Sequence, residues 1–304
     1  RPPAVAGSFY PANASQLAAA VRAYLADAAE SANGTPPKAL IVPHAGYIYS
    51  GPVAATSYAR LAPCAARITR VLLIGPAGCG KTHLAGQVAE ALDLKFSLNS
   101  MSEGASEAHL FGRMLPGNDG AWAHQPAPFV TAFRDGGMHL LDEIDAAEPN
   151  MLVSINTAIA NKTLSLPFAQ AEPIAAHEDF VLIASANTYG NGADRQYVGR
   201  NQLDAATMDR FKLGRVLVDY DRALERKLAE AHSSEESAAA ADAMLLWAWR
   251  VRDCIMQHKL RRIMSTRNII DAAKLLRVGV TLDSVRATYF MDWTDDEKAK
   301  GVRA

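Results

Sequence analysis

The stretch Gly75-Pro76-Ala77-Gly78-Cys79-Gly80-Lys81-Thr82 decides the fold of this chain. It fits the phosphate-binding loop pattern G-x-x-x-x-G-K-[ST] at every fixed position. An apolar stretch at residues 68–74 predicts a strand before the loop, and residues 82–92 predict a helix after it. In such a unit the backbone N–H groups of the loop and the helix N-terminus face an anion. The stretch therefore predicts an α/β fold that binds a nucleotide.

The end of this loop carries the side chains that would handle the nucleotide. Lys81 would reach the β- and γ-phosphates, and the Thr82 hydroxyl would ligate Mg²⁺. We assign the residues from Gly75 to Thr82, together with His83, to a predicted ATP-binding site. A glycine-rich turn without chemistry is the alternative, and the Lys-Thr pair in register argues against it.

Composition restricts the class of protein. With 304 residues the chain can form two domains, or one domain with a lid. The formal net charge of −1 gives no indication of a nucleic-acid partner or of an anionic membrane. Cys64, Cys79 and Cys254 show no paired spacing, which indicates a reducing compartment. Because no apolar run reaches the length of a membrane span and no signal peptide is visible, we expect a cytoplasmic protein.

Apolar stretches alternate with helical patterns along most of the chain. This alternation predicts a parallel sheet covered by helices on both faces, with nucleotide at the carboxyl ends of the strands. From Asp221 onward the pattern is helical only, which predicts a lid at residues 221–304 after a nucleotide-binding core at 67–220. We expect Trp247 and Trp249 to pack inside this lid rather than to stack on nucleotide. The predicted strands are residues 39–42, 68–74, 95–98, 137–141, 180–184 and 213–218.

A second motif supports the nucleotide site. Met138-His139-Leu140-Leu141-Asp142-Glu143 is an apolar strand that ends in two adjacent carboxylates, about sixty residues after the phosphate loop. Asp142 would hold Mg²⁺ through its water shell, and Glu143 would polarise a water for in-line attack on the γ-phosphorus. An ordinary acidic turn is the alternative interpretation of this pair.

From about Arg70 to its end the chain resembles the AAA+ ATPases, and within them the MoxR-type branch and the CobS subunit of cobaltochelatase. About three quarters of the chain is covered, with the motifs in the order and spacing of that family. The stretches that carry the resemblance are Gly75–Thr82, Phe111–Arg113, Phe129–Arg134, Leu140–Asp145, Ala184–Thr188, Ala193–Arg200, Asp209–Phe211 and Ser265–Arg267.

The resemblance implies further catalytic residues. Asn187 matches the sensor-1 residue that orients the attacking water, and Arg267 matches the sensor-2 arginine of the lid. Arg210 matches the arginine finger that a neighbouring subunit receives, and Arg200 is a second candidate for a role across that interface. Without the resemblance, Asn187 could cap a turn and Arg210 could form a surface ion pair. Residues 164–173 match an insertion hairpin suited to substrate contact.

The family pattern also implies partners. An arginine supplied in trans requires a neighbour, so we expect a homo-oligomer, with six subunits in a closed ring as the family's usual number. The resemblance implies Mg²⁺-dependent ATP hydrolysis that remodels a protein partner with a von Willebrand-type domain, or that drives metal insertion into a tetrapyrrole. A nucleotide-binding scaffold that does not hydrolyse ATP is the alternative function.

Residues 1–76 resemble a different family, the Memo proteins, on Arg1–Pro11 and Val42–Gly51. His44 matches the first of their metal ligands, but the next expected histidine is replaced where Gly75-Pro76 continues as Ala77-Gly78. One imidazole does not make a selective metal site, which disfavours a Memo-like metal enzyme and any role for Tyr47 and Tyr49 in one.

The two resemblances meet in one strand that ends in Gly75-Pro76, a feature common to both families. We interpret the chain as a fusion or chimera in which residues 1–66 are a truncated Memo-like segment. This segment replaces the part of an AAA+ chain that helps to hold the adenine base. Phosphate binding is therefore predicted, whereas recognition of the base is not.

Overall fold

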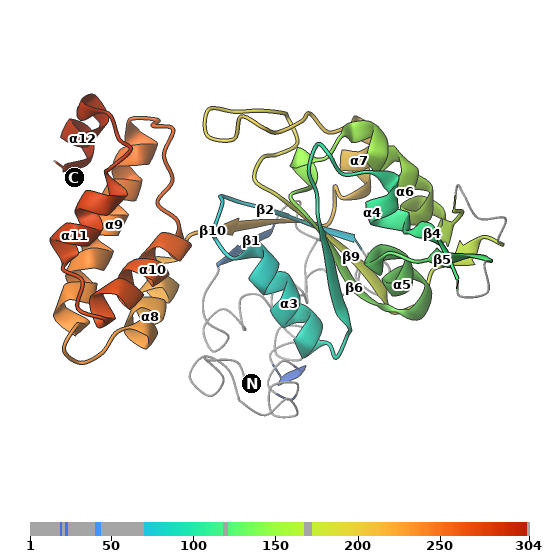
Figure 1. The fold of residues 1–304 in the computed structure, drawn as a ribbon, viewed down its shortest axis with the longest axis horizontal. Coiled ribbons are helices and arrows are strands. Elements are labelled where there is room, and N and C mark those ends of the chain that lie inside the picture. Colours follow the sequence, from blue (N-terminus) through green and yellow to red (C-terminus); the bar gives the residue numbers. More distant parts are fainter. Residues whose placement is uncertain are drawn as a thin grey trace, which may run out of the picture.

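The computed structural model in Figure 1 describes residues 70–117, 121–166 and 172–302, with the short segments 19, 22–23 and 40–43. Within this part of the chain, six parallel strands form one sheet in the order β1-β10-β2-β9-β6-β3. Every strand predicted from sequence is confirmed, with ends that differ by one or two residues. The strands are β1 Leu40–Pro43, β2 Arg70–Ile74, β3 Phe96–Ser100, β6 Gly137–Asp142, β9 Phe180–Ala186 and β10 Arg215–Asp219.

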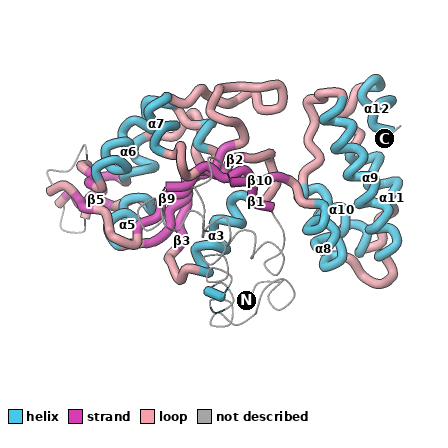
Figure 2. Tube along the Cα trace, turned by 180° about the vertical axis from the view of Figure 1, so that it is seen from behind, coloured by secondary structure: helices cyan, strands magenta, loops and turns pink. Residues whose placement is uncertain are grey.

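Helices cover both faces of this sheet, as the two views in Figures 1 and 2 show. Successive residues of a strand point to opposite faces, so a strand covered on both sides must be apolar throughout. Val71 and Leu73 of β2 pack into one buried cluster with α3 (Lys81–Ala91), whereas Leu72 and Ile74 pack into another with α5 (Pro128–Asp135) and α6 (Pro149–Asn161). The helices between β2 and β10 along the chain are α3 Lys81–Ala91, α4 Glu107–Phe111, α5 Pro128–Asp135, α6 Pro149–Asn161 and α7 Ala205–Arg210, with the 3₁₀ turn η1 Ile144–Ala146.

The strand β1 connects the N-terminal segment to the sheet. Leu40 pairs with Val216 and Pro43 with Asp219, in parallel with β10 at the edge of the sheet. At least one strand of the Memo-like segment therefore extends the ATPase sheet. The predictions on His44, Tyr47 and Tyr49 lie outside the described residues.

Two antiparallel hairpins project from the sheet and helices. β7 (Thr163–Leu164) and β8 (Ile174–Ala175) pair as the base of the insertion hairpin that the sequence predicts at residues 164–173. The second hairpin, β4 (Arg113–Pro116) with β5 (Trp122–Gln125), is a finding of the structure that the sequence analysis did not predict.

A separate bundle of helices follows β10, as predicted after Asp221 (Figure 1). It has its own buried core, in which Met244, Ala248 and Ile269 are fully buried. Trp247 packs edge-on against Tyr289, with ring centroids 5.5 Å apart, so its predicted packing role is confirmed. The helices of this lid are α8 Arg222–His232, α9 Ala238–Gln257, α10 Thr266–Arg277, α11 Leu282–Tyr289 and α12 Asp295–Val302.

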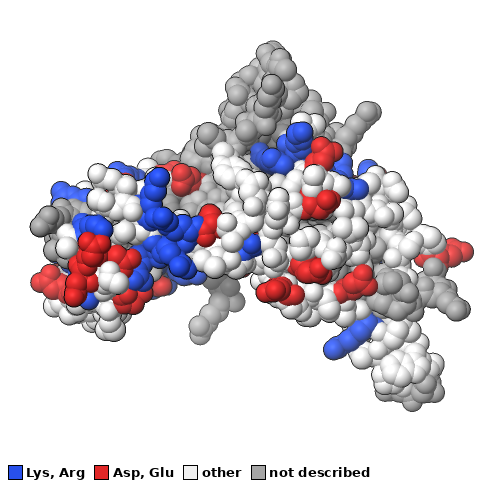
Figure 3. Space-filling model, turned by 90° about the horizontal axis from the view of Figure 1, so that it is seen from above, with Lys and Arg blue, Asp and Glu red and all other residues white. Residues whose placement is uncertain are grey.

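Two surface properties accord with the composition. Acidic and basic side chains share the face seen in Figure 3, as the formal net charge of −1 leads one to expect. Across the described ranges, no helix combines the length and the hydropathy that crossing a bilayer requires.

Candidate nucleotide-binding and hydrolysis site

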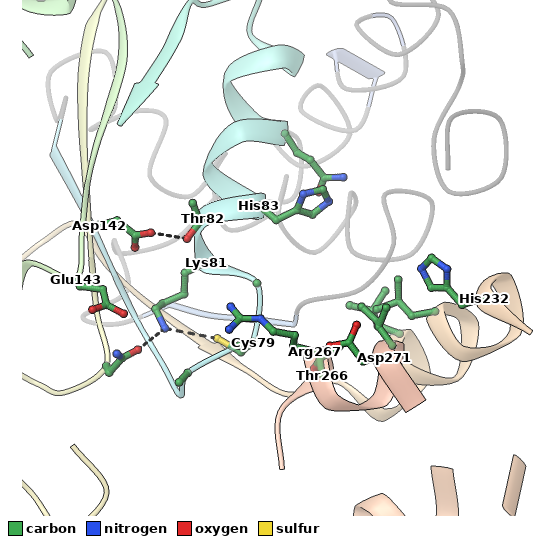
Figure 4. Close-up of a pocket in the computed structure, with 18 of the residues that line it drawn as sticks. Cys79, Lys81, Thr82, His83, Asp142, Glu143, His232, Thr266, Arg267 and Asp271 are labelled. Carbon is green, nitrogen blue, oxygen red and sulfur yellow. Dashed lines mark hydrogen bonds between the residues drawn. The ribbon is translucent and has the colours of Figure 1, made fainter. Parts of the chain in front are cut away.

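A cavity of about 600 Å³ lies where the carboxyl ends of the central strands meet the lid. The phosphate loop forms one side of the cavity, and Asp142, Glu143 and Asn187 from the tips of β6 and β9 form another. The lid closes a third side with Arg267 (Figure 4). Other lining side chains are His83, Gln87, Leu224, Leu228, His232, Thr266, Ile270, Asp271 and Lys274. The sequence therefore predicted the phosphate side of this cavity, whereas most of the lid side was not predicted.

The phosphate loop is shaped by close approaches that only glycine allows. A Cβ at Gly75 would lie 1.8 Å from the Val218 carbonyl oxygen of β10. Gly78 has a φ of +71°, and a Cβ there would meet the Ser265 side chain of the lid at 2.7 Å. Gly80 has a φ of +96° and precedes the first turn of α3. The loop thus packs closely against β10 on one side and the start of α10 on the other, and its N–H groups lie at the N-terminus of α3.

Lys81 is buried at the centre of the site, with 7% of its surface exposed. Its Nζ donates to the carbonyl oxygens of Gly75 at 2.8 Å and Pro76 at 3.0 Å. It also donates to Asn187 Oδ1 at 2.8 Å, so the predicted sensor-1 amide and the predicted phosphate-binding lysine are in contact. Burial lowers the pKa of Lys81 from its ordinary value. This arrangement places a desolvated ammonium where a polyphosphate would interact strongly with it.

The two predicted Mg²⁺ ligands are brought together. The Thr82 hydroxyl donates to Asp142 Oδ2 at 2.7 Å, as Figure 4 shows. The Ser185 hydroxyl of β9 donates to Asp142 Oδ1 and holds the carboxylate from the other side. Mg²⁺ takes oxygen ligands and keeps several waters, binding through one or two protein groups plus phosphate oxygens. A hydroxyl and a carboxylate side by side at the cavity wall fit that requirement.

Glu143 follows in a left-handed backbone conformation, with a φ of 57°. Its N–H donates to Ser185 Oγ at 3.2 Å, and its side chain lines the cavity. Glu143 Oε2 accepts from both terminal nitrogens of Arg200, at 3.1 and 3.2 Å. Arg200, a candidate from the sequence for a role across a subunit interface, is thus paired with a carboxylate of its own chain.

Asp145 is a buried residue beside this site for which the sequence predicted no role. It has no exposed surface, and its Oδ2 accepts from the N–H groups of Asn187 and Thr188 at 3.0 and 2.9 Å and from the Thr188 hydroxyl at 2.9 Å. Its Oδ1 lies 3.7 Å from Arg200 Nε. Asp145 therefore fixes the loop that presents Asn187.

The two remaining predicted arginines occupy different places. Arg267 lies in the first turn of α10, and its side chain extends toward the phosphate loop in Figure 4. Arg210 lies in the last turn of α7 and donates to the Ala206 carbonyl oxygen. Among the described residues that line the cavity, Arg267 is present and Arg210 is not. This distribution is what a same-subunit sensor and an arginine supplied to a neighbour require.

Two tyrosines that were not predicted from the sequence hold the backbone of one loop residue, Ala77, through its N–H and its carbonyl oxygen. Tyr197 Oη accepts from the Ala77 N–H at 2.8 Å, and Tyr220 Oη donates to the Ala77 carbonyl oxygen at 2.7 Å. Burial raises the pKa of both phenols above their ordinary value, so both stay protonated. The Arg252 guanidinium of the lid lies over the Tyr220 ring, 3.9 Å from its centroid. The loop is thereby connected to the lid.

Family comparisons agree with this geometry. The AAA domain family (dynein-related subfamily) matches residues 70–211, and the CbbQ/NirQ/NorQ C-terminal family matches residues 225–302. The Memo-like protein family matches residues 1–91, so the strand and loop at 70–91 fall within both an ATPase and a Memo-like match.

Individual proteins show the same division. The denitrification regulatory protein NirQ of Stutzerimonas stutzeri is 30% identical over 211 residues, covering 69% of this chain and 73% of NirQ. NorQ of Paracoccus denitrificans is 29% identical over 240 residues, covering 77% of this chain and 83% of NorQ. A MEMO1 family protein of Ignicoccus hospitalis is 46% identical over 84 residues, covering 25% of this chain and 29% of that protein. NtrX from Brucella abortus in complex with ADP has a TM-score of 0.53, 15% identity, and coverage of 90% of this chain and 74% of NtrX, a likeness of fold alone.

A phosphate loop, a strand tip bearing Asp142 and Glu143, and a helical lid over one cavity define the class as AAA+ ATPase. Within that class, the chain belongs to the MoxR-like family of NirQ, NorQ and CbbQ, and it carries a Memo-like segment at its N-terminal side. The resemblances to both families are confirmed.

Proposed function

We propose that this protein hydrolyses ATP with Mg²⁺ as a ring of identical subunits, and uses the resulting motions to remodel a protein partner. The observation that carries the proposal is the convergence of Lys81, Thr82, Asp142, Glu143 and Asn187 on one cavity. These groups come from two strand tips and one helix start, and together they supply the parts that phosphoryl transfer to water needs.

The residues of the chain would divide the reaction among them. Lys81 exchanges its carbonyl partners for phosphate oxygens, and the loop N–H groups hold the β-phosphate. Bound Mg²⁺ would neutralise charge on the phosphates, with Thr82 and Asp142 as the protein groups that hold it. Glu143 takes a proton from the attacking water. Lys81 holds the Asn187 amide through its Oδ1, and that amide orients the water.

Arg210 is the group that makes the proposed reaction depend on assembly. It lies outside the cavity of its own chain, so in the proposed ring it reaches the γ-phosphate bound by the neighbour. Arginines supplied in this way are worth roughly 10³–10⁵ in rate in nucleotide hydrolases. Arg267 closes the same subunit's site from the lid.

Steady-state ATP turnover per subunit, measured over a range of protein concentrations with Lys81→Ala as the blank, tests the proposal. We expect the turnover per subunit to rise with concentration and to vanish in the variant. Turnover at the blank level at every concentration, from folded protein that still binds ATP, would support the alternative scaffold function.

The proposed partner is a protein, by analogy with relatives, and the proposed contact element is a hairpin that projects from the ATPase core. NirQ is named a denitrification regulatory protein, and we propose that this chain likewise acts on another protein, one that carries a von Willebrand-type domain. The hairpin of β7 and β8 is the element we propose for that contact. Deletion of residues 165–173 should leave basal turnover within about twofold while abolishing stimulation by such a partner.

A further inference from the structure

Arg200 forms an ion pair with the proposed catalytic base, in which Glu143 is about half exposed and Arg200 is largely buried. Its side chain is 13% exposed, and both terminal nitrogens contact the same oxygen, Glu143 Oε2. Arg200 lies in the segment between β9 and α7, and it is not among the described residues that line the cavity. Among the described residues, Arg200 thus contacts Glu143 without lining the cavity itself, whereas Glu143 lines it.

A second carboxylate keeps Arg200 in this place. Arg200 Nε lies 3.7 Å from Oδ1 of Asp145, a side-chain oxygen that has no hydrogen-bond partner among the described residues. The other oxygen of Asp145 accepts three donors from Asn187 and Thr188. A guanidinium presents its donors in a rigid planar fork, so one arginine can face two carboxylates in a fixed geometry that a rotatable lysine ammonium does not reproduce.

The contacts connect the two groups that must act on the attacking water. Asp145 fixes the backbone of Asn187, and through Arg200 it also fixes the carboxylate of Glu143. The two hydrogen bonds from Arg200 to Glu143 are charge-assisted, and such bonds are stronger than neutral ones. The base and the sensor amide therefore share one buried anchor.

We propose that Arg200 is a positioning residue that orients Glu143 within its own subunit, with Asp145 as the anchor of both. This inference rests on the proposed function, since it assigns a role in ATP hydrolysis. It also separates the two arginines that a sequence reading groups together: Arg210 acts on the neighbouring subunit, and Arg200 acts on its own.

The proposal predicts a particular kinetic signature for Arg200→Ala. Nucleotide contacts come from the phosphate loop and the lid, so the KM for ATP should stay within about twofold of wild type. A misplaced base lowers the rate of the chemical step, so kcat should fall by about tenfold or more. Arg200→Lys keeps the charge without the fork, and its kcat should lie between those of wild type and Arg200→Ala. Circular dichroism and fluorescent-nucleotide binding check that both variants fold.

Mixing of subunits distinguishes a role within the subunit from a role across the interface. Lys81→Ala subunits lack a working phosphate loop but carry intact Arg200 and Arg210. Added to Arg210→Ala subunits, they should restore part of the turnover, because each can supply the missing arginine to a neighbour. Added to Arg200→Ala subunits, they should restore none.

The outcomes distinguish a failure of this inference from a failure of the proposed function. Recovery of Arg200→Ala by Lys81→Ala subunits would show a role in trans and overturn the inference, as would an unchanged kcat or a KM that rises with the fall in kcat. If neither mixture recovers, the ring part of the proposed function fails, while a lowered kcat in Arg200→Ala still supports action within the subunit. Absence of turnover in wild type would overturn the proposed function and this inference together.

Discussion

The ATPase core and the lid each contain a buried carboxylate, and the two are held in different ways. Asp145 in the core accepts three donors on one oxygen, and its other oxygen lies 3.7 Å from Arg200. Glu225 in the lid is surrounded on both oxygens, by two bonds from Arg252 at 2.6 and 2.9 Å and by Trp249 and Thr266 at 2.7 Å each. Within the described residues, one oxygen of Asp145 therefore has no hydrogen bond, and this network adjoins the cavity. Both oxygens of Glu225, in contrast, accept two hydrogen bonds each.

The two networks therefore differ in what they contribute to the protein. A buried ion pair rarely adds much net stability, but removing one partner of it is costly because a charge stays behind without compensation. The saturated pair of Glu225 and Arg252 fixes the helices α8, α9 and α10 to one another. The contacts of Asp145 and Arg200 instead fix the direction of side chains that face the cavity. We therefore expect changes in the core network to affect turnover and changes in the lid network to affect folding.

The largest expected effect is that of Glu143→Gln in the core network. The amide keeps the shape of the side chain but cannot take a proton, and general bases contribute about 10²–10⁴ in rate. Turnover should fall by that factor, while ATP binding and the melting temperature stay close to those of wild type. The measurement is kcat beside fluorescent-nucleotide affinity, and ordinary turnover in this variant would remove Glu143 from the mechanism.

Breaking the lid network should act on stability instead. Glu225→Ala leaves the Arg252 guanidinium buried without its carboxylate, which costs about 3–5 kcal/mol of unfolding free energy. The matched control is Asp253→Ala, which breaks the ion pair with Arg222 where both side chains are about half exposed, and should cost less than about 1 kcal/mol. Urea unfolding of both variants decides the comparison. Equal losses would show that burial does not distinguish the two ion pairs.

His139 is a third buried titratable side chain, and it differs from Asp145 and Glu225 in that its contact is with a neutral hydroxyl. His139 in β6 has no exposed surface, its Nδ1 contacts Ser97 Oγ at 2.8 Å, and burial lowers its pKa to about 3. The folded protein therefore favours the neutral ring. This contribution to stability is complete above pH 6.5, the ordinary pKa, and is lost progressively as the pH falls from there toward 3.

The expected loss from His139 over that range is on the order of a few kcal/mol. Carboxylates also titrate below pH 5, so the measurement is the difference between wild type and His139→Leu in unfolding free energy across pH 4 to 8. We expect the difference to shift in favour of the leucine variant as the pH falls. A difference that does not change with pH would contradict the assignment of a neutral buried ring.

How much of this could be predicted depends on where the partners lie in the sequence. Lys81, Thr82, Asp142 and Glu143 belong to short motifs whose spacing is set by a strand, a loop and a helix, and the structure brings them together as predicted. Apolar runs likewise predicted all six strands of the parallel sheet, because central strands that are covered on both faces are mostly apolar.

The missed features depend on contacts between distant residues. Tyr220 donates to a carbonyl 143 positions away, and Arg200 reaches a carboxylate 57 positions away. A tyrosine that bonds to a backbone carbonyl leaves no pattern of residue types at a fixed spacing, and only the packed fold shows the pair. The hairpin of β4 and β5 was missed for another reason, since its strands are short and mostly exposed and lack a strong apolar alternation.

The smallest predicted effect tests whether the lid network reaches the phosphate loop. Tyr220→Phe removes the hydroxyl that bonds to Ala77 but keeps the ring under Arg252. Loss of one such hydrogen bond costs about 1 kcal/mol, so the KM for ATP should rise by about fivefold. Tyr289→Phe is the matched control, because its hydroxyl donates to the Ile263 carbonyl oxygen at 3.1 Å inside the lid. It should lower stability by a similar amount and leave the KM unchanged. If both variants raise the KM alike, or neither does, Tyr220 is a packing residue and the loop is positioned without the lid.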